Sequence, residues 1–285
     1  MQLLYADDLV DIKKEELKSK FKNDFFKDKY LAIVFLGHDA ASKIFIKNKI
    51  RFGSEVWIDV RVFGQDAILD LNSTIDMIEK LNHDKYCIGI IVQLPLSDHL
   101  KMHRREILDS IDIKKDVDML HTKNLELIRD NKTSLQTATV RWALELLHFY
   151  KLDNYKDKKI TIIGQSNLIG RPLGWWLKRQ WALVQTYDIH STMEEIIDSC
   201  KSSYLIFSAT GVPGLIDDRA ISGGMQVFVD FGFGMKDEAI YGDVILDNDK
   251  YIDDQIYITP VPWWLGKMTV VGLFENLYDM VKGEL

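Results

Sequence analysis

The chain has 285 residues, of which 47% are hydrophobic and 28% are charged, a composition typical of a globular protein with room for one large or two modest domains. The formal net charge of -7 argues against broad binding to nucleic acid, which needs clustered lysine and arginine. Cys87 and Cys200 are the two cysteines, too few for a disulfide framework or a cysteine-rich metal site, and we expect no bound metal.

The first half of the sequence alternates between helical and strand patterns. We expect helices at residues 11–27, 40–52, 66–82 and 98–110, the second of them capped by Asp39, and strands at 31–36, 55–62 and 87–92. This βαβαβ order favours a parallel α/β layer, in which ligands gather beyond the carboxyl ends of the strands. We therefore expect Gly37, Gln93 and Asp118 to lie close together at that edge.

The second half repeats this alternation after an expected linking helix at 137–150 and a charged stretch at 151–159, where we place the domain boundary. Strands are expected at 160–163, 182–187, 204–208, 226–229 and 256–258. A helix at 267–282 is apolar on one side and is expected to pack against the first half. The predicted fold class is α/β with two α/β domains, residues 1–150 completed by 267–285, and residues 151–266.

The stretch 160–174 reads as a buried strand, a glycine turn and the start of a helix. Gly164 allows a sharp turn and Gly170 allows the main chain to approach closely. Such a turn presents backbone N–H groups and the positive end of a helix dipole, which suit a pyrophosphate. The spacing G-x-S-x-x-x-G differs from the common G-x-G-x-x-G, so an ordinary βα turn explains the glycines alone equally well.

Seven stretches occur in one characteristic order: GHDAASKIFIKNK (37–49), GIIVQLPL (89–96), KDVD (115–118), IIGQSNLIGRPL (162–173), ATGVPG (209–214), GDV (242–244) and TPVP with LGKMT (259–269). Together they resemble the bifunctional methylenetetrahydrofolate dehydrogenase/cyclohydrolases and cover nearly the whole chain. The resemblance implies a folate-binding catalytic domain built from both chain ends, a Rossmann-like dinucleotide-binding domain between them, a folate site in the cleft, and a homodimer.

The resemblance also assigns roles to three residues of the first half. Lys49 matches the family's catalytic lysine, which with a shifted pKa can relay a proton during hydrolysis. Gln93 matches the glutamine that contacts this lysine and the folate, and Asp118 matches the aspartate that hydrogen-bonds the pterin edge. On the residues alone, a solvated helix lysine, a capping glutamine and a turn aspartate are the simpler interpretations.

The sequence departs from the family pattern at three places. Phe45 replaces the tyrosine four residues before the lysine and so lacks the hydroxyl that would orient it, a change that commonly costs a factor of about a hundred in the step supported. Trp263 and Trp264 follow Pro262 where the family has glycines, and either stack on a ligand, close the pocket, or pack in the core or a dimer contact. Residues 135–138 replace the family's Pro-Cys-Thr-Pro segment.

The cofactor is expected to be NAD rather than NADP. Gln165 stands where the family commonly carries an arginine suited to a 2'-phosphate. Asp188 ends the next strand, close to where an acidic residue binds the ribose 2'-hydroxyl of NAD, although a turn aspartate is the simpler alternative. The candidate cofactor-binding residues are Gly164, Gln165, Ser166, Gly170, Arg171, Asp188, Ala209, Thr210 and Gly211; the candidate substrate-binding residues are Phe45, Lys49, Gln93, Asp118, Pro262, Trp263 and Trp264.

These expectations combine into one leading hypothesis, an oxidoreductase of one-carbon folate metabolism that converts 5,10-methylenetetrahydrofolate to the 5,10-methenyl form. Cyclohydrolase action through Lys49, giving 10-formyltetrahydrofolate, is left open by Phe45. The alternatives are an enzyme on the same scaffold with another one-carbon or amine substrate, and a catalytically silent cofactor-binding homologue. No signal peptide or membrane span is expected, and the location is expected to be cytoplasmic.

Overall fold

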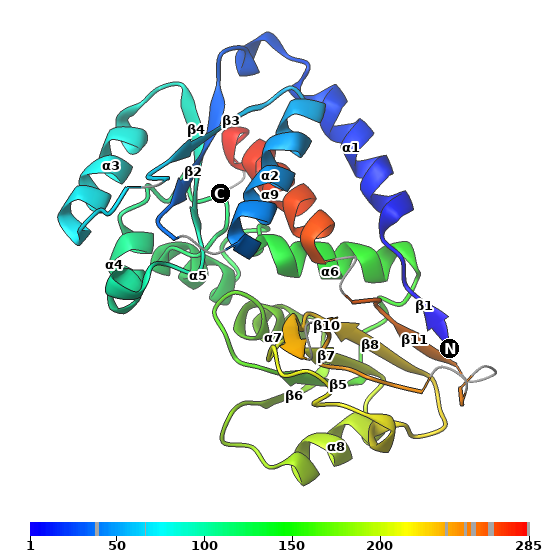
Figure 1. Ribbon diagram of the computed structural model, residues 1–285. Coiled ribbons are helices and arrows are strands. Elements are labelled where there is room, and N and C mark those ends of the chain that lie inside the picture. The colour runs from blue at the N-terminus through cyan, green and yellow to red at the C-terminus, as the bar shows by residue number, and fades with distance from the viewer. Residues whose placement is uncertain are drawn as a thin grey trace. The chain divides into compact units, whose positions relative to one another are not determined.

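The computed structural model describes residues 1–37, 40–65, 67–236, 239–247, 250–251, 255–261 and 265–283. The chain forms two compact units, each with its own parallel sheet (Figure 1). Unit 1 comprises Met1–Leu9 and Thr139–Met268, and unit 2 comprises Val10–Ala138 and Thr269–Leu285. Within the described ranges, no helix combines the length and the apolar character needed to cross a membrane.

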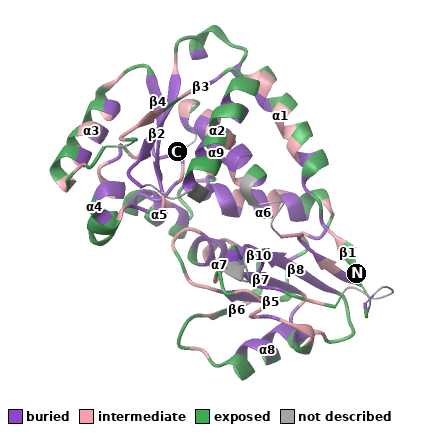
Figure 2. Cartoon of the chain, viewed as in Figure 1, coloured by how far each residue is buried: buried purple, intermediate pink, exposed green. Residues whose placement is uncertain are grey.

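Unit 2 is built on the parallel sheet β3-β2-β4. Its strands are β2 (Tyr30–Phe35), β3 (Asp59–Phe63) and β4 (Cys87–Gln93). Strands β2 and β4 are buried along their whole length (Figure 2), as expected of strands in a parallel sheet. The βαβαβ order predicted from the sequence is confirmed.

The helices of unit 2 differ from the predicted ones mainly at their ends. Helix α3 begins only at Leu71, because the Asp70 carboxylate caps it by accepting the N–H of Ser73 at 2.8 Å. The single helix expected at 98–110 is divided into η2 and α4, and α5 was not predicted. The elements are α1 (Asp7–Phe21), η1 (Asp24–Phe26), α2 (Ala40–Glu55), α3 (Leu71–His83), η2 (Asp98–His103), α4 (Arg104–Asp109) and α5 (Thr122–Arg129).

The C-terminal helix α9 (Leu265–Val281) joins unit 2 from Thr269 onward, as predicted. Phe274 on α9 is fully buried and its ring lies 6.4 Å from that of Phe21 and 5.2 Å from that of Phe52, measured between centroids. Aromatic contacts of this kind add to the burial of apolar area that drives packing. The last helix of the chain therefore completes the core of a unit whose sheet comes from the first half.

Unit 1 contains a six-stranded sheet in the order β1-β11-β8-β7-β5-β6, in which every pair of neighbours is parallel. This is the Rossmann-like parallel sheet that was expected. Helices α6 (Ala138–Phe149), α7 (Gly170–Arg179) and α8 (Met193–Ser202) alternate with the strands. The strands are β1 (Gln2–Leu3), β5 (Lys159–Ile163), β6 (Leu183–Tyr187), β7 (Leu205–Ser208), β8 (Gln226–Asp230) and β11 (Ile256–Ile258).

Among the described residues of unit 1, the short helix η3 (Asp218–Ala220) and the following features were not predicted. The edge strand β1 is too short to show a periodic pattern, and the chain places it beside β11. Helix α8 was missed, although its Thr192 capping box is visible in the sequence. Strand β9 (Gly234–Lys236) pairs antiparallel with β10 (Ala239–Tyr241).

The compact units divide the chain at other places than the sequence suggested. The charged stretch 151–159 lies inside unit 1, and the change of unit falls between Ala138 and Thr139. Leu152 and Tyr155 are buried there, and the Tyr155 ring meets that of Trp176 edge-on at 5.4 Å. The lysines of this stretch are therefore exposed, while Leu152 and Tyr155 anchor it in the core of unit 1.

Candidate functional site

Lys49 and Gln93 form a buried hydrogen-bonded pair in unit 2. Lys49 lies on α2 and Gln93 is the last residue of β4, and their side chains are 7% and 8% exposed. The Lys49 ammonium donates from Nζ to Gln93 Oε1 at 2.8 Å. Gln93 Nε2 donates to the carbonyl of Leu94 at 2.8 Å, which leaves the amide oxygen facing the lysine. A solvated helix lysine is therefore the wrong description of Lys49.

Asp118 acts on the charge of the same lysine. Burial lowers the pKa of Lys49, and the negative charge of Asp118 partly opposes this shift. Burial likewise raises the pKa of Asp118, and the positive charge of Lys49 partly opposes it. The structure therefore brings Lys49, Gln93 and Asp118 together, with both ionisable groups shifted in the directions that ease proton transfer. Their catalytic roles stay predictions.

The loop that carries Asp118 is held by residues that the sequence analysis did not single out. Asp116 is buried, and its Oδ2 accepts the N–H of His121 at 2.7 Å and the Asn124 side-chain amide at 2.9 Å. Burial raises the pKa of Asp116 to about 6. Asn276, on α9, donates from Nδ2 to the carbonyl of Val117 at 3.0 Å. Only the C-terminal helix supplies this last contact, so no local pattern could have revealed it.

The remaining candidates of the substrate site fall into two groups. Phe45 lies on α2 one turn before Lys49 and is half-buried. Pro262, Trp263 and Trp264 lie outside the described residues, as does the capping residue Asp39, and the expectations attached to them stay predictions.

The glycine turn of unit 1 joins β5 to α7. Gly164 has a φ of +95°, and a Cβ added there would lie 2.4 Å from the carbonyl oxygen of Ala209. A Cβ on Gly170 would lie 1.8 Å from the carbonyl oxygen of Gly164. Both contacts are to main-chain atoms that cannot move aside, so both positions require glycine. The glycines let the turn pack closely against its own main chain between β5 and α7, and such a strand-turn-helix geometry is typical of dinucleotide-binding folds.

Side chains of the turn hold its shape. Ser166 Oγ accepts the N–H of Ile169 at 3.2 Å, and Gln165 Nε2 donates to the Gly164 carbonyl at 3.1 Å. Arg171 is exposed and donates from Nη1 to Asn167 Oδ1 at 3.2 Å. Ser166 and Gln165 thus stabilise the turn, and Ser166 and Arg171 are also exposed to solvent near the start of α7.

The register of the sheet brings the other candidates of unit 1 to the same edge. Ile163 pairs with Tyr187 on one side and Ser208 on the other, so Gly164, Asp188 and Ala209 follow three neighbouring strand ends. Asp188 is exposed, and its Oδ1 accepts the N–H of His190 at 2.9 Å. Such an edge is where parallel sheets bind ligands. Thr210 and Gly211 continue the turn after β7.

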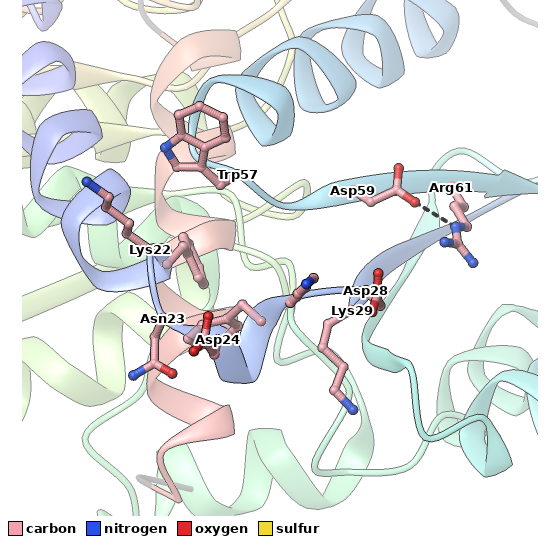
Figure 3. Close-up of a pocket in the computed structure, with 11 residues that line it drawn as sticks. Lys22, Asn23, Asp24, Asp28, Lys29, Trp57, Asp59 and Arg61 are labelled. Atoms are coloured by element: carbon pink, nitrogen blue, oxygen red, sulfur yellow. Dashed lines mark hydrogen bonds and ion pairs between the residues drawn. The ribbon is translucent and has the colours of Figure 1, made fainter.

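A cavity of about 450 Å³ in unit 2 lies elsewhere (Figure 3). Lys29, Asp59 and Arg61 line it, and these residues precede or begin β2 and β3, whereas Gln93 ends β4. The cavity is therefore at the opposite ends of the strands from the Lys49–Gln93 pair. Arg61 Nε is paired with Asp59 at 2.7 Å, as the dashed line shows, and Lys29 Nζ donates to the carbonyl of Lys85.

Comparisons with known proteins agree with this arrangement. The model of the "Tetrahydrofolate dehydrogenase/cyclohydrolase, catalytic domain" matches residues 4–118, and that of the corresponding "NAD(P)-binding domain" matches residues 137–285. The "Bifunctional protein FolD" of Acholeplasma laidlawii is 34% identical over 279 residues, covering 98% of this chain and 97% of its own.

Two solved structures are similar over the whole length. The FolD methylenetetrahydrofolate dehydrogenase/cyclohydrolase of Campylobacter jejuni is 31% identical with a TM-score of 0.87, covering 100% of both chains. The bifunctional 5,10-methylenetetrahydrofolate dehydrogenase/cyclohydrolase of Thermoplasma acidophilum is 26% identical with the same TM-score and 99% coverage of each chain. With its matching sheets and its Lys49–Gln93–Asp118 group, the chain belongs to the tetrahydrofolate dehydrogenase/cyclohydrolase family.

Proposed function

We propose that this protein oxidises 5,10-methylenetetrahydrofolate to the 5,10-methenyl form with a nicotinamide dinucleotide. The observation that carries the proposal is the buried Lys49–Gln93 hydrogen bond beside Asp118. Family membership supports the same reaction, because the relatives compared above are methylenetetrahydrofolate dehydrogenase/cyclohydrolases. The glycine turn at Gly164 and Gly170 supports the dinucleotide, since it is a tight turn between a parallel strand and a helix N-terminus, where a pyrophosphate can accept backbone N–H groups.

The chemistry divides between binding and proton handling. A nicotinamide dinucleotide held at the Gly164–Gly170 turn would supply the hydride acceptor for oxidation of the folate methylene group. The Asp118 carboxylate accepts hydrogen bonds from the pterin edge and fixes the ring. Gln93 holds Lys49 in place, and the two side chains together present both a donor and an acceptor to the folate.

Hydrolysis converts the methenyl cation and water to the neutral formyl product and one released proton, so both protons leave the water. The second goes to solvent as the carbonyl forms, and the first leaves as the water attacks. Because burial lowers the pKa of Lys49, its neutral amine is more accessible than that of an exposed lysine and can accept this proton. The resulting ammonium can return the proton to the folate nitrogen that is released. Lys49 thus acts as a relay in the cyclohydrolase step, which is the second part of the proposal.

An absorbance assay for the methenyl product tests both steps with wild type and Lys49→Met. We expect wild type to form the product with a nicotinamide cofactor, and Lys49→Met to hydrolyse it at least about a hundredfold more slowly. Lys47→Met is the matched control, because Lys47 is exposed on the same helix. Equal hydrolysis by Lys49→Met and wild type would remove Lys49 from the mechanism, and a wild type inactive on every folate would favour another substrate or a silent homologue.

We further propose a preference for NAD over NADP. The carboxylate of Asp188 would repel a 2'-phosphate, at a cost of about 1–4 kcal/mol near a protein surface, and Gln165 offers no compensating charge. Asp188→Ser is expected to raise the use of NADP relative to NAD by about tenfold. Asp198→Ser, which removes an exposed carboxylate of α8, is the control. An unaltered ratio in Asp188→Ser would count against this preference.

Phe45 sets the expected strength of the hydrolytic step. It lies one helical turn before Lys49 but has no hydroxyl to orient the lysine or a water molecule. Phe45→Tyr is expected to speed methenyl hydrolysis by about a hundredfold and leave dehydrogenation within about a factor of two. If both steps changed equally, the ring rather than the hydroxyl would be responsible.

The proposal also includes a homodimer and a cytoplasmic location, which the family resemblance and the free cysteines Cys87 and Cys200 support. An enzyme with a different one-carbon or amine substrate is the second candidate, because tryptophans stand at 263 and 264 where the family has glycines. The absorbance assay with folate and non-folate amines separates these two candidates.

A further inference from the structure

A buried aspartate of unit 1 holds the turn that follows β7. Asp243 is fully buried, and its Oδ2 accepts three hydrogen bonds, from Ser208 Oγ at 2.7 Å, from the backbone N–H of Thr210 at 2.7 Å and from Thr210 Oγ1 at 2.8 Å. Bonds to a charged acceptor are roughly twice as strong as neutral ones. Two of the three donors belong to one residue of the turn, so Asp243 fixes both its main chain and its side chain.

A second buried aspartate, Asp230, fixes the position of Asp243. Asp230 ends β8, and its Oδ1 accepts the N–H groups of Gly232 at 2.7 Å and Asp243 at 3.0 Å, while its Oδ2 accepts that of Val244 at 2.9 Å. The N–H of Asp230 donates to Thr259 Oγ1 at 2.8 Å, next to the end of β11. Hydrogen bonds therefore run from the end of β11, through the ends of β8, to the turn after β7.

The packing around these carboxyls is as close as that of the glycine turn. A Cβ on Gly232 would lie 2.2 Å from Asp243 Oδ1, and one on Gly242 would lie 2.0 Å from Asp230 Oδ2. Asp243 Oδ1 has no hydrogen-bond partner among the described residues. Burying an acidic side chain with an unsatisfied oxygen costs stability, which an apolar core would avoid. The need to hold the Ala209–Gly211 turn through Thr210 explains why this buried carboxyl is present.

The segment 242–243 also forms backbone hydrogen bonds with residues 214–216, which follow the Ala209–Gly211 turn. Gly214 donates its N–H to the Gly242 carbonyl at 3.0 Å, and Ile216 donates to the Asp243 carbonyl at 2.9 Å. Gly211, between these contacts and Thr210, has a φ of +71°. The turn is thus fixed at both ends against one segment, while Gly211 stays exposed at the carboxyl edge of the sheet.

We propose that Asp243, held by Asp230, is a positioning residue that keeps the Ala209–Gly211 turn in the conformation that receives the dinucleotide. The inference rests on the proposed function, in which this turn binds the cofactor. Asp243 acts through Thr210 and does not touch the ligand. Because methenyl hydrolysis consumes no nicotinamide, a defect confined to the turn weakens dinucleotide binding and dehydrogenation but spares hydrolysis.

The test measures NAD and NADP dissociation constants by titration and both reaction steps by absorbance, for wild type, Asp243→Ala and Asp243→Asn. Asp243→Ala removes the acceptor and is expected to weaken dinucleotide binding by about tenfold or more. Asp243→Asn keeps a carbonyl oxygen for the Thr210 donors and is expected to restore most of the affinity. Hydrolysis stays within about a factor of two of wild type in both. Asp217→Ala is the matched control, because Asp217 also accepts a backbone N–H, that of Arg219, at 3.0 Å.

Unchanged dinucleotide affinity in Asp243→Ala would overturn the inference, as would an equal loss of binding and hydrolysis. If Asp243→Ala does not fold, Ser208→Ala takes its place, since it removes one donor to Asp243 from a residue outside the cofactor-binding candidates. A dissociation constant raised severalfold supports the inference, and an unchanged one overturns it. A wild type that binds neither dinucleotide would instead overturn the proposed function.

Discussion

The two candidate sites of this protein differ in whether side chains or the backbone form them. In unit 2 the candidate residues are buried side chains: Lys49 and Gln93 are nearly inaccessible and hydrogen-bonded, and burial lowers the pKa of Lys49 and raises that of Asp118. In unit 1, backbone geometry at Gly164 and Gly170 makes the site. The comparison teaches that the two candidate sites depend on different properties: desolvated, hydrogen-bonded side chains in unit 2, and close main-chain packing that only glycine allows in unit 1.

The largest effect should come from adding a side chain at the closest main-chain contact of the glycine turn. Gly170→Ala puts a Cβ within 1.8 Å of a backbone oxygen, so either the turn or the start of α7 must move. We expect a loss of unfolding free energy of about 3 kcal/mol or more and loss of dinucleotide binding. Thermal unfolding and cofactor titration measure the two effects.

Gly174→Ala is the matched control on the same helix. The nearest atom to its added Cβ would be Ile162 Cδ1 at 3.6 Å, an ordinary van der Waals contact. Because alanine favours helices by about 1 kcal/mol over glycine, this variant should be as stable as wild type or more so. Equal behaviour of the two variants would show that the turn does not depend on its glycines.

The next largest effect should come from the charge beside Lys49. Asp118→Asn removes the negative charge that opposes the desolvation of the lysine, so the pKa of Lys49 should fall further. The part of the hydrolysis pH profile that reflects ionisation of Lys49 then moves to lower pH. Folate affinity falls by about tenfold to a hundredfold, because the charged acceptor for the pterin edge is lost. Asp76→Asn, an exposed change on α3, should alter neither. A profile that stays in place would separate Asp118 from the lysine.

The smallest effect concerns the buried carboxyl of Asp230 and its influence on stability. Burial raises its pKa from 3.8 to about 7, against the opposing pull of its backbone donors. Between these values the folded state keeps a proton that the unfolded state has lost, so the free energy of unfolding falls as the pH rises, by at most about 1.4 kcal/mol per pH unit. Asp230→Asn should flatten this slope in urea unfolding between about pH 5 and pH 7. Parallel slopes for the two proteins would contradict it.

The sequence predicted most of the secondary structure because strand and helix patterns are local. The apolar runs of β2, β4 and β5 and the glycine turn after β5 need no distant information. Predictions failed where the signal was too short, as for β1, or where a single capping residue, Asp70, decided where a helix begins.

Candidate site residues were found through ordered motifs rather than through their surroundings. The GDV motif pointed to residue 243 but gave no role for it, because its partners Ser208 and Thr210 are more than thirty positions away. Asn276 offered no signal, since its contact with the Val117 carbonyl spans 159 positions. Burial and hydrogen bonding between distant segments are properties of the folded chain.

By itself, the sequence determined the order of strands and helices, the positions where only glycine fits, and the residue types available for chemistry. The tertiary structure alone decided that Lys49 is desolvated against Gln93 and Asp118, that α9 completes the core of unit 2, and that Asp230 and Asp243 lock a turn of unit 1. The physical reason is that propensity and periodicity act over a few residues, whereas desolvation and side-chain hydrogen bonding depend on which distant segments the packing brings together.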